Sequence, residues 1–286
     1  MAELLIRGKG REAADLDDAI AIQGALAAHR SRKVKARTAL RNQVHANLDL
    51  VFPGLSGCFG SILDTKVGRL LLEEAVTPLR VRRLGMERLR RFCSKRGVVL
   101  KRAKATQIVE AAQLAFNLPG AISDLHARLL AADVSLLARL DLEVARTEGE
   151  LSEILPQTPA AILTTIPLVA VVRASNYGGA VGDPTRFKRA AQVYRLSGLV
   201  PKLYESAGKK RSGTHISREG KVELRQAIID LGRALRQGHP DFARYADELR
   251  ARGKHKGVVR CALGQRANRV AFAMMRDQRP FDPARW

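Results

Sequence analysis

The residue in this sequence best suited to chemistry is Ser206, a hydroxyl in a short segment rich in turns and cations. A Gly-Leu-Val-Pro turn at 198–201 precedes it, and the run Lys209, Lys210 and Arg211 follows it. Serine becomes a nucleophile when neighbouring groups orient or deprotonate it, and cations beside it can hold a phosphodiester. The same composition is typical of an ordinary nucleic-acid-binding loop. Both interpretations stay open on these residues alone.

Two carboxylates near the start of the chain, Asp15 and Asp18, could supply metal ligands. Residues three apart are neighbours on a helix face, and carboxylate oxygens at that spacing can share a divalent cation. Acidic residues are also common in the first turn of a helix, where they complement its positive end. His215 lies in the same segment as Ser206 and is a candidate base, a phosphate contact or a bystander.

The composition indicates a polyanionic partner. The formal net charge is +22 over 286 residues, from 50 Lys+Arg against 28 Asp+Glu. Such an excess repels itself in a compact protein, and nucleic acid is the usual polyanion that neutralises it. A membrane surface is less favoured, because no segment combines a strong apolar face with a uniformly basic one. Cations on or near the predicted helices are therefore expected to contact phosphates: Arg37, Arg41, Lys209, Lys210, Arg211, Arg218, Lys221 and Arg225.

Other features favour a cytoplasmic protein. The longest apolar run, over 160–172, is too short to cross a bilayer, and no secretory signal is evident. The cysteines, Cys58, Cys93 and Cys261, have no metal-like spacing, which indicates a reducing compartment and no zinc site. Aromatic residues make up only 5%, which disfavours stacking platforms for single strands.

The fold class is expected to be mainly α. Alanine, leucine and arginine dominate, and no stretch alternates with period two. We predict a long helix over 15–49, a loop over 51–60, a helical group over 61–117 and a third long helix over 123–155. Heptad repeats mark the last of these, and Asp141 and Glu148 interrupt one seam. A coiled coil and a globular amphipathic helix are equally compatible with this pattern.

Beyond a Pro-Gln-Thr-Pro linker at 156–159 we expect a compact helical unit. It would contain an apolar helix over 160–175, a glycine turn at Gly178-Gly179 and, after the Ser206 segment, an amphipathic helix. One stripe of that helix carries Leu224, Ile228, Leu231 and Leu235. The tail after His239 remains basic and is expected to add one or two helices.

Several motifs occur together in the order found in the IS110 family of insertion-sequence transposases, including its IS1111 branch, which this chain resembles over about 15–235. They are Thr165-Ile166-Pro167, Gly182-Asp183, Phe187, Gly198-Leu199-Val200-Pro201, Glu205-Ser206-Ala207-Gly208, Ile216-Ser217-Arg218-Glu219-Gly220 and Leu224-Arg225. Upstream, the segment 14–19 is similar to the family's Thr-Asp-x-x-Asp-Ala motif, and 37–45 to the basic helix after it.

The resemblance implies specific roles. Ser206 would be the nucleophile that forms a covalent phosphoserine with DNA, and Asp15 and Asp18 would be Mg²⁺ ligands of a RuvC-like nuclease domain. It also implies dimers or tetramers, and a structured RNA that guides the protein to DNA. The protein would work in the bacterial cytoplasm, at the nucleoid.

The chain departs from the family pattern in ways that affect these expectations. The family's acidic tetrad begins with an Asp and a Glu upstream, whereas only fourteen residues precede Asp15 here. We therefore expect a truncated, inactive chain with three parts: a RuvC-like remnant and basic helix (1–50), a helical or coiled-coil region (51–155) and a C-terminal transposase domain (156–286). The family's hairpin glycines are replaced by Leu168 and Ala170, with Val169 between them. A non-catalytic DNA- or RNA-binding remnant, and a helical scaffold that binds RNA by charge alone, are the alternatives.

Overall fold

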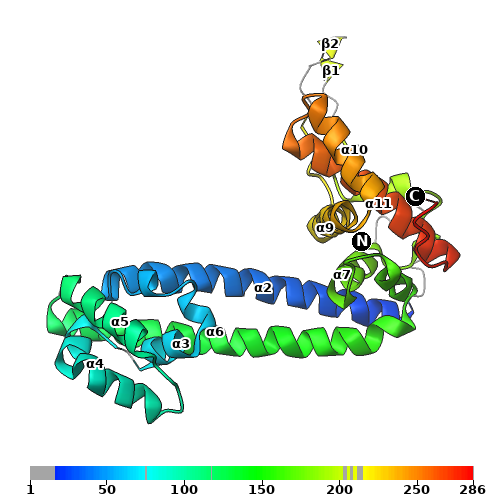
Figure 1. Ribbon diagram of the computed structural model, residues 1–286. Coiled ribbons are helices and arrows are strands. Elements are labelled where there is room, and N and C mark those ends of the chain that lie inside the picture. Colours follow the sequence, from blue (N-terminus) through cyan, green and yellow to red (C-terminus); the bar gives the residue numbers. More distant parts are fainter. Residues whose placement is uncertain are drawn as a thin grey trace. The chain divides into compact units, whose positions relative to one another are not determined.

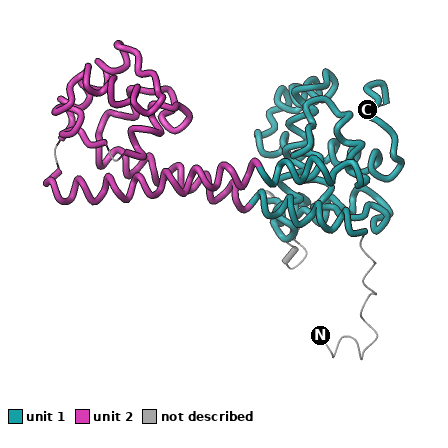
Figure 2. The backbone as a smooth tube through the Cα atoms, turned by 90° about the horizontal axis from the view of Figure 1, so that it is seen from below, with its two compact units in different colours: residues 1–31, 146–286 teal, residues 32–145 magenta. Residues whose placement is uncertain are grey.

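The computed structural model describes residues 17–74, 76–116, 118–201, 205–206, 209–210 and 215–285, with backbone only at 205–206 and 209–210. Over these residues the regular secondary structure is helical, apart from two two-residue strands and an isolated bridge. This confirms the predicted fold class. None of the described helices is long and apolar enough to span a membrane. The chain forms two compact units, residues 1–31 with 146–286 and residues 32–145 (Figure 2).

The second unit, residues 32–145, is a helical bundle (Figure 1). It takes its long elements from α2 (Asp18–Val51) and α6 (Gly120–Ile154), each of which continues into the first unit. Between them lie α3 (Lys66–Glu73), α4 (Pro78–Ser94), α5 (Arg102–Leu114) and the 3₁₀ turns η1 (Ser56–Cys58) and η2 (Ile62–Asp64). All seven elements contribute to one apolar core, whose fully buried members include Val44, Leu71, Leu89, Ile108 and Leu137.

Local sequence signals explain where the short helices begin. Thr65 caps α3 by accepting a hydrogen bond from the amide of Gly68 at 3.1 Å, and Thr77 caps α4 through the amide of Arg80 at 3.3 Å. Pro78 follows Thr77 at the first helical position, where its missing N–H leaves no intrahelical bond unmade. Capping by a threonine satisfies backbone donors that have no partner inside the helix.

The heptad seam of α6 is buried in the protein's own core, at Leu130, Val134, Leu137, Val144, Leu151 and, just after α6, Leu155. The two acidic residues that interrupt the pattern face arginines. Asp141 accepts from Arg37 at 3.5 Å and from Arg69 at 2.9 Å. Glu148, in the first unit, pairs with Arg30 at 2.6 Å. The apparent breaks in the heptad pattern are therefore positions where the neighbouring helix supplies a cation.

The first unit consists mainly of the C-terminal half of the chain. It contains the 3₁₀ turns η3 (Leu155–Gln157), η4 (Pro159–Thr165) and η5 (Pro184–Arg186), and the helices α7 (Val171–Val181) and α8 (Ala190–Leu196). After the hairpin β1 (Glu205–Ser206) and β2 (Lys209–Lys210) come α9 (Val222–Gly238), α10 (Pro240–Ala251) and α11 (Lys256–Asp277). The predicted apolar stripe of α9 is fully buried: Leu224, Ile228, Leu231 and Leu235.

A buried polar network joins three helices of this unit. The Tyr177 hydroxyl on α7 donates to the side-chain oxygen of Asn268 on α11 at 2.9 Å. The Asn268 amide donates in turn to the carbonyl of Ala190 on α8 at 2.8 Å. Burial raises the pKa of the Tyr177 phenol, so that this hydroxyl stays protonated and available as a donor.

The structure corrects three details of the expected layout. The apolar helix expected over 160–175 is not continuous, because the 3₁₀ turn η4 ends at Thr165 and α7 begins at Val171. Gly178 and Gly179 lie inside α7 and not in a turn, because α2 crosses them at close range. A Cβ on Gly179 would come within 2.9 Å of the Cα of Gly24. The segment 156–159 is not an extended linker, since Thr158 is buried and its hydroxyl donates to the carbonyl of Leu155 at 2.9 Å.

Leu168 has a backbone conformation that disfavours its side chain. Its φ is +63°, in the left-handed region, and the side chain is 55% exposed. A residue with a Cβ pays roughly 1–2 kcal/mol there because the Cβ approaches the following carbonyl oxygen. This is the first of the two positions where the hairpin motif of the resembled family has glycine. Leu168 therefore adopts a backbone conformation that glycine would adopt without this strain.

We expect Asp141→Asn to lower the free energy of unfolding by about 1 kcal/mol, because it weakens two partly exposed ion pairs at once. Urea unfolding followed by helical circular dichroism would measure the loss. Asp124→Asn on the same helix is the matched control, since its carboxylate has no ion pair or hydrogen bond among the described residues. Equal effects of the two variants would contradict a specific role for Asp141.

We expect Leu168→Gly to raise the free energy of unfolding by about 0.5–1 kcal/mol. The gain is the relieved strain, reduced by the larger backbone entropy that glycine has in the unfolded chain. Leu168→Ala is the control, because alanine keeps the Cβ and should bring no gain. If the alanine variant is stabilised as much as the glycine variant, backbone strain is not the cause.

Candidate nucleic-acid interface

The segment between α8 and α9 forms a small antiparallel hairpin that contains Ser206. In β1 and β2, Glu205 pairs with Lys210 and Ser206 pairs with Lys209. The backbone at Ser206 is therefore directly opposite a basic residue on the other strand. The side chains of Ser206, Lys209 and Lys210, and all of Arg211, lie outside the described residues, so their predicted chemistry stays a prediction.

The two ends of this segment are tied together by backbone hydrogen bonds, and we call residues 196–201 and 215–221 the hairpin base. Pro201 and Ile216 form an antiparallel bridge. The amide of Ser217 donates to the carbonyl of Val200 at 2.8 Å, and that of Arg218 to the carbonyl of Gly198 at 3.1 Å. The amide of Lys221 donates to the carbonyl of Leu196 at 2.9 Å. The chain thus enters and leaves the hairpin through a closed backbone ladder.

Two glycines make this close approach possible. Gly198 has φ +68°, and a Cβ there would lie 2.8 Å from the carbonyl oxygen of Glu219. Gly220 has φ +155°, and its Cβ would lie 2.3 Å from the carbonyl oxygen of Leu196. Side chains at either position would push the two chain segments apart. Gly198 begins the Gly-Leu-Val-Pro turn before Ser206, and Gly220 ends the motif at 216–220 after it.

Arg225 holds the hairpin base from the first turns of α9. Its Nε donates to the carbonyl of Ser197 at 2.9 Å, and one terminal nitrogen donates to the carbonyl of Arg218 at 2.7 Å. The planar guanidinium therefore bridges both sides of the base, a geometry that the ammonium of lysine cannot reproduce. The structure gives this residue, predicted to bind phosphate, a positioning role as well.

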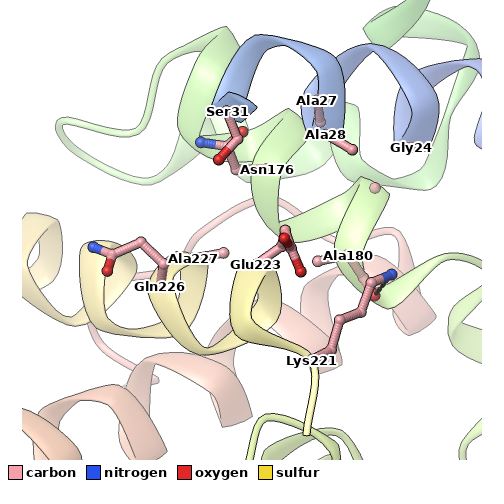
Figure 3. A pocket seen from close by; sticks show the side chains of 11 residues that line it. Gly24, Ala27, Ala28, Ser31, Asn176, Ala180, Lys221, Glu223, Gln226 and Ala227 are labelled. Atoms are coloured by element: carbon pink, nitrogen blue, oxygen red, sulfur yellow. Dashed lines mark hydrogen bonds between the residues drawn. The ribbon is translucent and has the colours of Figure 1, made fainter. Parts of the chain in front are cut away.

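Lys221 lies at the start of α9, beside a small pocket of about 180 Å³ (Figure 3). Its Nζ donates to the carbonyl of Ala180 at the end of α7 at 3.0 Å. Glu223, Asn176 and Ser31 line the same pocket, from α9, α7 and α2. The sequence alone does not predict that these three polar residues lie together, because they come from segments far apart in the chain and share no motif.

Arg218 and His215 are two of the exposed polar residues of the hairpin base. Arg218 has φ +56°, and its guanidinium forms no hydrogen bond or ion pair with any described residue. An unpaired cation beside the hairpin is the arrangement that a phosphate contact requires. The structure therefore leaves the predicted role of Arg218 available.

Arg37 and Arg41 lie in the second unit, where both are engaged by carboxylates. Arg37 contacts Asp141, as described above. Arg41 binds Asp64 through two nitrogens, with distances of 3.0 to 3.1 Å. A hydrogen bond from Ser61, and then one from Arg41, lower the pKa of Asp64. This carboxylate favours folding above its unfolded-state pKa, and the contribution is lost as the pH falls through the lowered value.

Only one of the two predicted metal ligands, Asp18, lies within the described residues. Asp18 is exposed in the first turn of α2, and Asp15 lies outside the described residues. The neighbouring Asp17 uses its carboxylate to accept from the amide of Ala19 at 2.8 Å, as a helix cap. No group of three potential His, Cys, Asp or Glu ligands occurs in the described part of the chain. The pairing of Asp15 with Asp18 on a Mg²⁺ ion therefore stays a prediction.

Arg225→Lys should lower the free energy of unfolding by about 1–2 kcal/mol, because two charge-assisted hydrogen bonds to backbone carbonyls are lost or weakened. Hydrogen exchange at the amides of Ser217 and Lys221, which close the hairpin base, should also become faster. Arg218→Lys is the control, as its side chain is exposed and unpaired among the described residues. Unchanged exchange at both amides in Arg225→Lys would contradict the positioning role.

Comparisons with known proteins agree with the motifs around this hairpin. A sequence model described as the transposase IS116/IS110/IS902 family matches residues 160–247. The uncharacterized 43.6 kDa protein of insertion element IS110 from Streptomyces coelicolor is 28% identical over 242 residues, which cover 84% of this chain and 59% of that protein. The pilin gene-inverting protein of Moraxella bovis is 27% identical over 129 residues, 43% of this chain and 38% of that protein.

A third relative is the transposase for insertion sequence element IS1328 of Yersinia enterocolitica, which is 28% identical over 115 residues, 39% of this chain and 34% of that protein. The chain spans less than two thirds of the length of each of these relatives. The family match includes the hairpin, its base and all of α9. Residues 160–247 of this chain are therefore similar to the transposase IS116/IS110/IS902 family.

Proposed function

We propose that this protein acts in DNA transposition, as a transposase of an insertion sequence, and that Ser206 is the nucleophile that attacks a DNA phosphodiester. The observation that carries the proposal is the closed hairpin base. It lies within the family-matched residues, and in the hairpin above it Ser206 is the second residue of β1 and pairs with Lys209. A rigid base under a basic hairpin is what presenting a hydroxyl to a phosphate requires.

The proposed reaction needs no reagent other than the protein and DNA. The Ser206 oxygen attacks phosphorus and forms a phosphoserine, while the bond from phosphorus to one deoxyribose oxygen breaks. The proton of the serine leaves with that deoxyribose oxygen. Attack by a second DNA hydroxyl on the phosphoserine would reverse these changes and join a new strand. Lys209 and Lys210, opposite β1, would offset the charge that builds on the phosphate oxygens.

Mg²⁺, Asp15 and Asp18 enter the proposal only through the family. A bound divalent ion would polarise the phosphate, but no described set of residues forms its ligands, and no step above depends on it. The proposed partner is DNA. Guidance by a structured RNA and assembly into dimers or tetramers are further proposals that rest on the same resemblance.

The alternative is a non-catalytic nucleic-acid-binding protein in which the hairpin is only a binding loop. Leu168 is the observation that favours it. A bulky, half-exposed side chain occupies a position where the family's glycine would let backbone amides approach a phosphate. A scaffold that binds RNA by charge alone is a third possibility. It predicts equal affinity for any polyanion and a steep salt dependence.

Covalent trapping distinguishes these proposals. The protein would be incubated with labelled duplexes that cover the DNA on both sides of its own gene and then analysed by denaturing electrophoresis. We expect a protein–DNA adduct that resists denaturation and is lost in Ser206→Ala. Ser212→Ala is the matched control, because Ser212 is the other serine between Pro201 and Ile216. No adduct with the unaltered protein, or an adduct that survives Ser206→Ala, would favour the non-catalytic alternative.

A further inference from the structure

A cleft of about 290 Å³ lies in the first unit, where α9, the end of α10 and the start of α11 meet. Its lining includes no carboxylate and five cationic side chains, which we call the cationic cleft: Arg233, Arg236, Arg250, Lys256 and Arg260. The sequence alone shows that the tail of the chain is basic but not that its cations lie together. The folding of that tail against α9 gathers its cations around one hollow.

Close packing of two helices positions these residues. A Cβ on Gly232 of α9 would come within 2.9 Å of the backbone nitrogen of Gly264 on α11, so the helices touch backbone to backbone. Arg233 directly follows one contact glycine, and Arg260 lies one helical turn before the other. Buried Val259 and Leu263 line the apolar part of the cleft. The arginines are therefore held by a rigid, well-packed crossing.

Most cations of the cleft have no ion-pair partner among the described residues. Arg236 is the exception, with a long contact of 3.8 Å to Asp247, whose side chain is 69% exposed. The other four cations form no hydrogen bond or ion pair with any described residue. By contrast, Arg30 and Arg41 are bound tightly to Glu148 and Asp64. The structure thus separates arginines that hold the fold from arginines that have no internal partner.

On the α11 side of the cleft, no carboxylate close in sequence balances this charge. Between Glu248 and Asp277 the chain has no acidic residue, whereas it has eight lysines and arginines. A solvated protein surface usually intersperses both signs of charge. Gathering like charges at one hollow is unfavourable unless an anion binds there. Since guanidinium groups match phosphate oxygens through two parallel donors, the complementary ligand is a phosphate group.

We propose that the cationic cleft binds the sugar–phosphate backbone of duplex DNA, as a second contact in addition to the Ser206 hairpin. The choice of DNA rests on the proposed function, whereas the affinity for phosphate rests on the cleft itself. The contact is independent of sequence, because arginines that bind phosphate read no base edges. Its effect is to hold the duplex on the transposase domain while the hairpin meets the phosphodiester.

The test compares two pairs of substitutions with the same change in charge. Arg233→Gln with Arg260→Gln removes two unpaired cations from the cleft. The control pair is Arg269→Gln with Arg279→Gln, both exposed and outside the cleft lining. Arg269 lies nine residues beyond Arg260 on α11, which is about half a turn around the helix. Affinity for a short DNA duplex would be measured at several salt concentrations, with thermal unfolding to verify the fold.

We expect the cleft pair to lower the affinity roughly tenfold, since two charge-assisted contacts are lost. The slope of log affinity against log salt should decrease by about 1.8, that is two contacts at about 0.9 each. The control pair should change the affinity less than about twofold. Equal losses in both pairs, no loss in the cleft pair, or a loss with an RNA duplex but not with DNA would each overturn the proposal.

The binding test of the cleft and the trapping test of Ser206 can fail independently of each other. Ser206→Ala should keep the affinity and the salt slope of the unaltered protein, because it removes no charge. If no covalent adduct forms but the cleft pair still loses affinity selectively, the cleft proposal stands and the nucleophile proposal fails. If adducts form and the cleft pair binds normally, the cleft proposal fails alone.

Discussion

The proposed presentation of Ser206 depends on one close backbone contact, the closure of the hairpin base between α8 and α9. Gly198 and Gly220 allow the two chain segments to touch, and Arg225 joins their carbonyls from the buried helix α9. Because α9 packs its apolar stripe into the core of the first unit, the base inherits the rigidity of that core.

The same helix also carries the cationic cleft, so α9 links the two proposed contacts with DNA. Arg225 lies near its first turn, and Arg233 and Arg236 lie two to three turns later. The glycine contact between Gly232 and Gly264 places α11 against α9, which brings Arg260 to the same hollow. A single well-packed helix can thus relate a nucleophile-bearing hairpin to a phosphate-binding cleft.

The excess of positive charge has two distinct uses in the described residues. Arg30, Arg37, Arg41 and Arg69 pair with carboxylates and fill polar positions between helices. Arg218, Arg233 and Arg260 have no such partner and are exposed. Net charge measures only the sum of the two groups, so it does not distinguish Arg37 and Arg41, which pair with carboxylates, from Arg218, which has no such partner among the described residues. The fold, and not the composition, assigns each arginine to a role.

The sequence by itself determined the helical class, the limits of the long helices within a few residues, the buried stripe of α9 and the motif turns around Ser206. These are local properties, because periodicity, caps and glycine positions act over a few residues. Only the tertiary structure decided that Gly178 and Gly179 lie within a helix, that Asp141 and Glu148 meet arginines, and that five cations gather at one cleft. Each of these depends on which helices touch, and contacts between residues a hundred positions apart leave no local pattern to read.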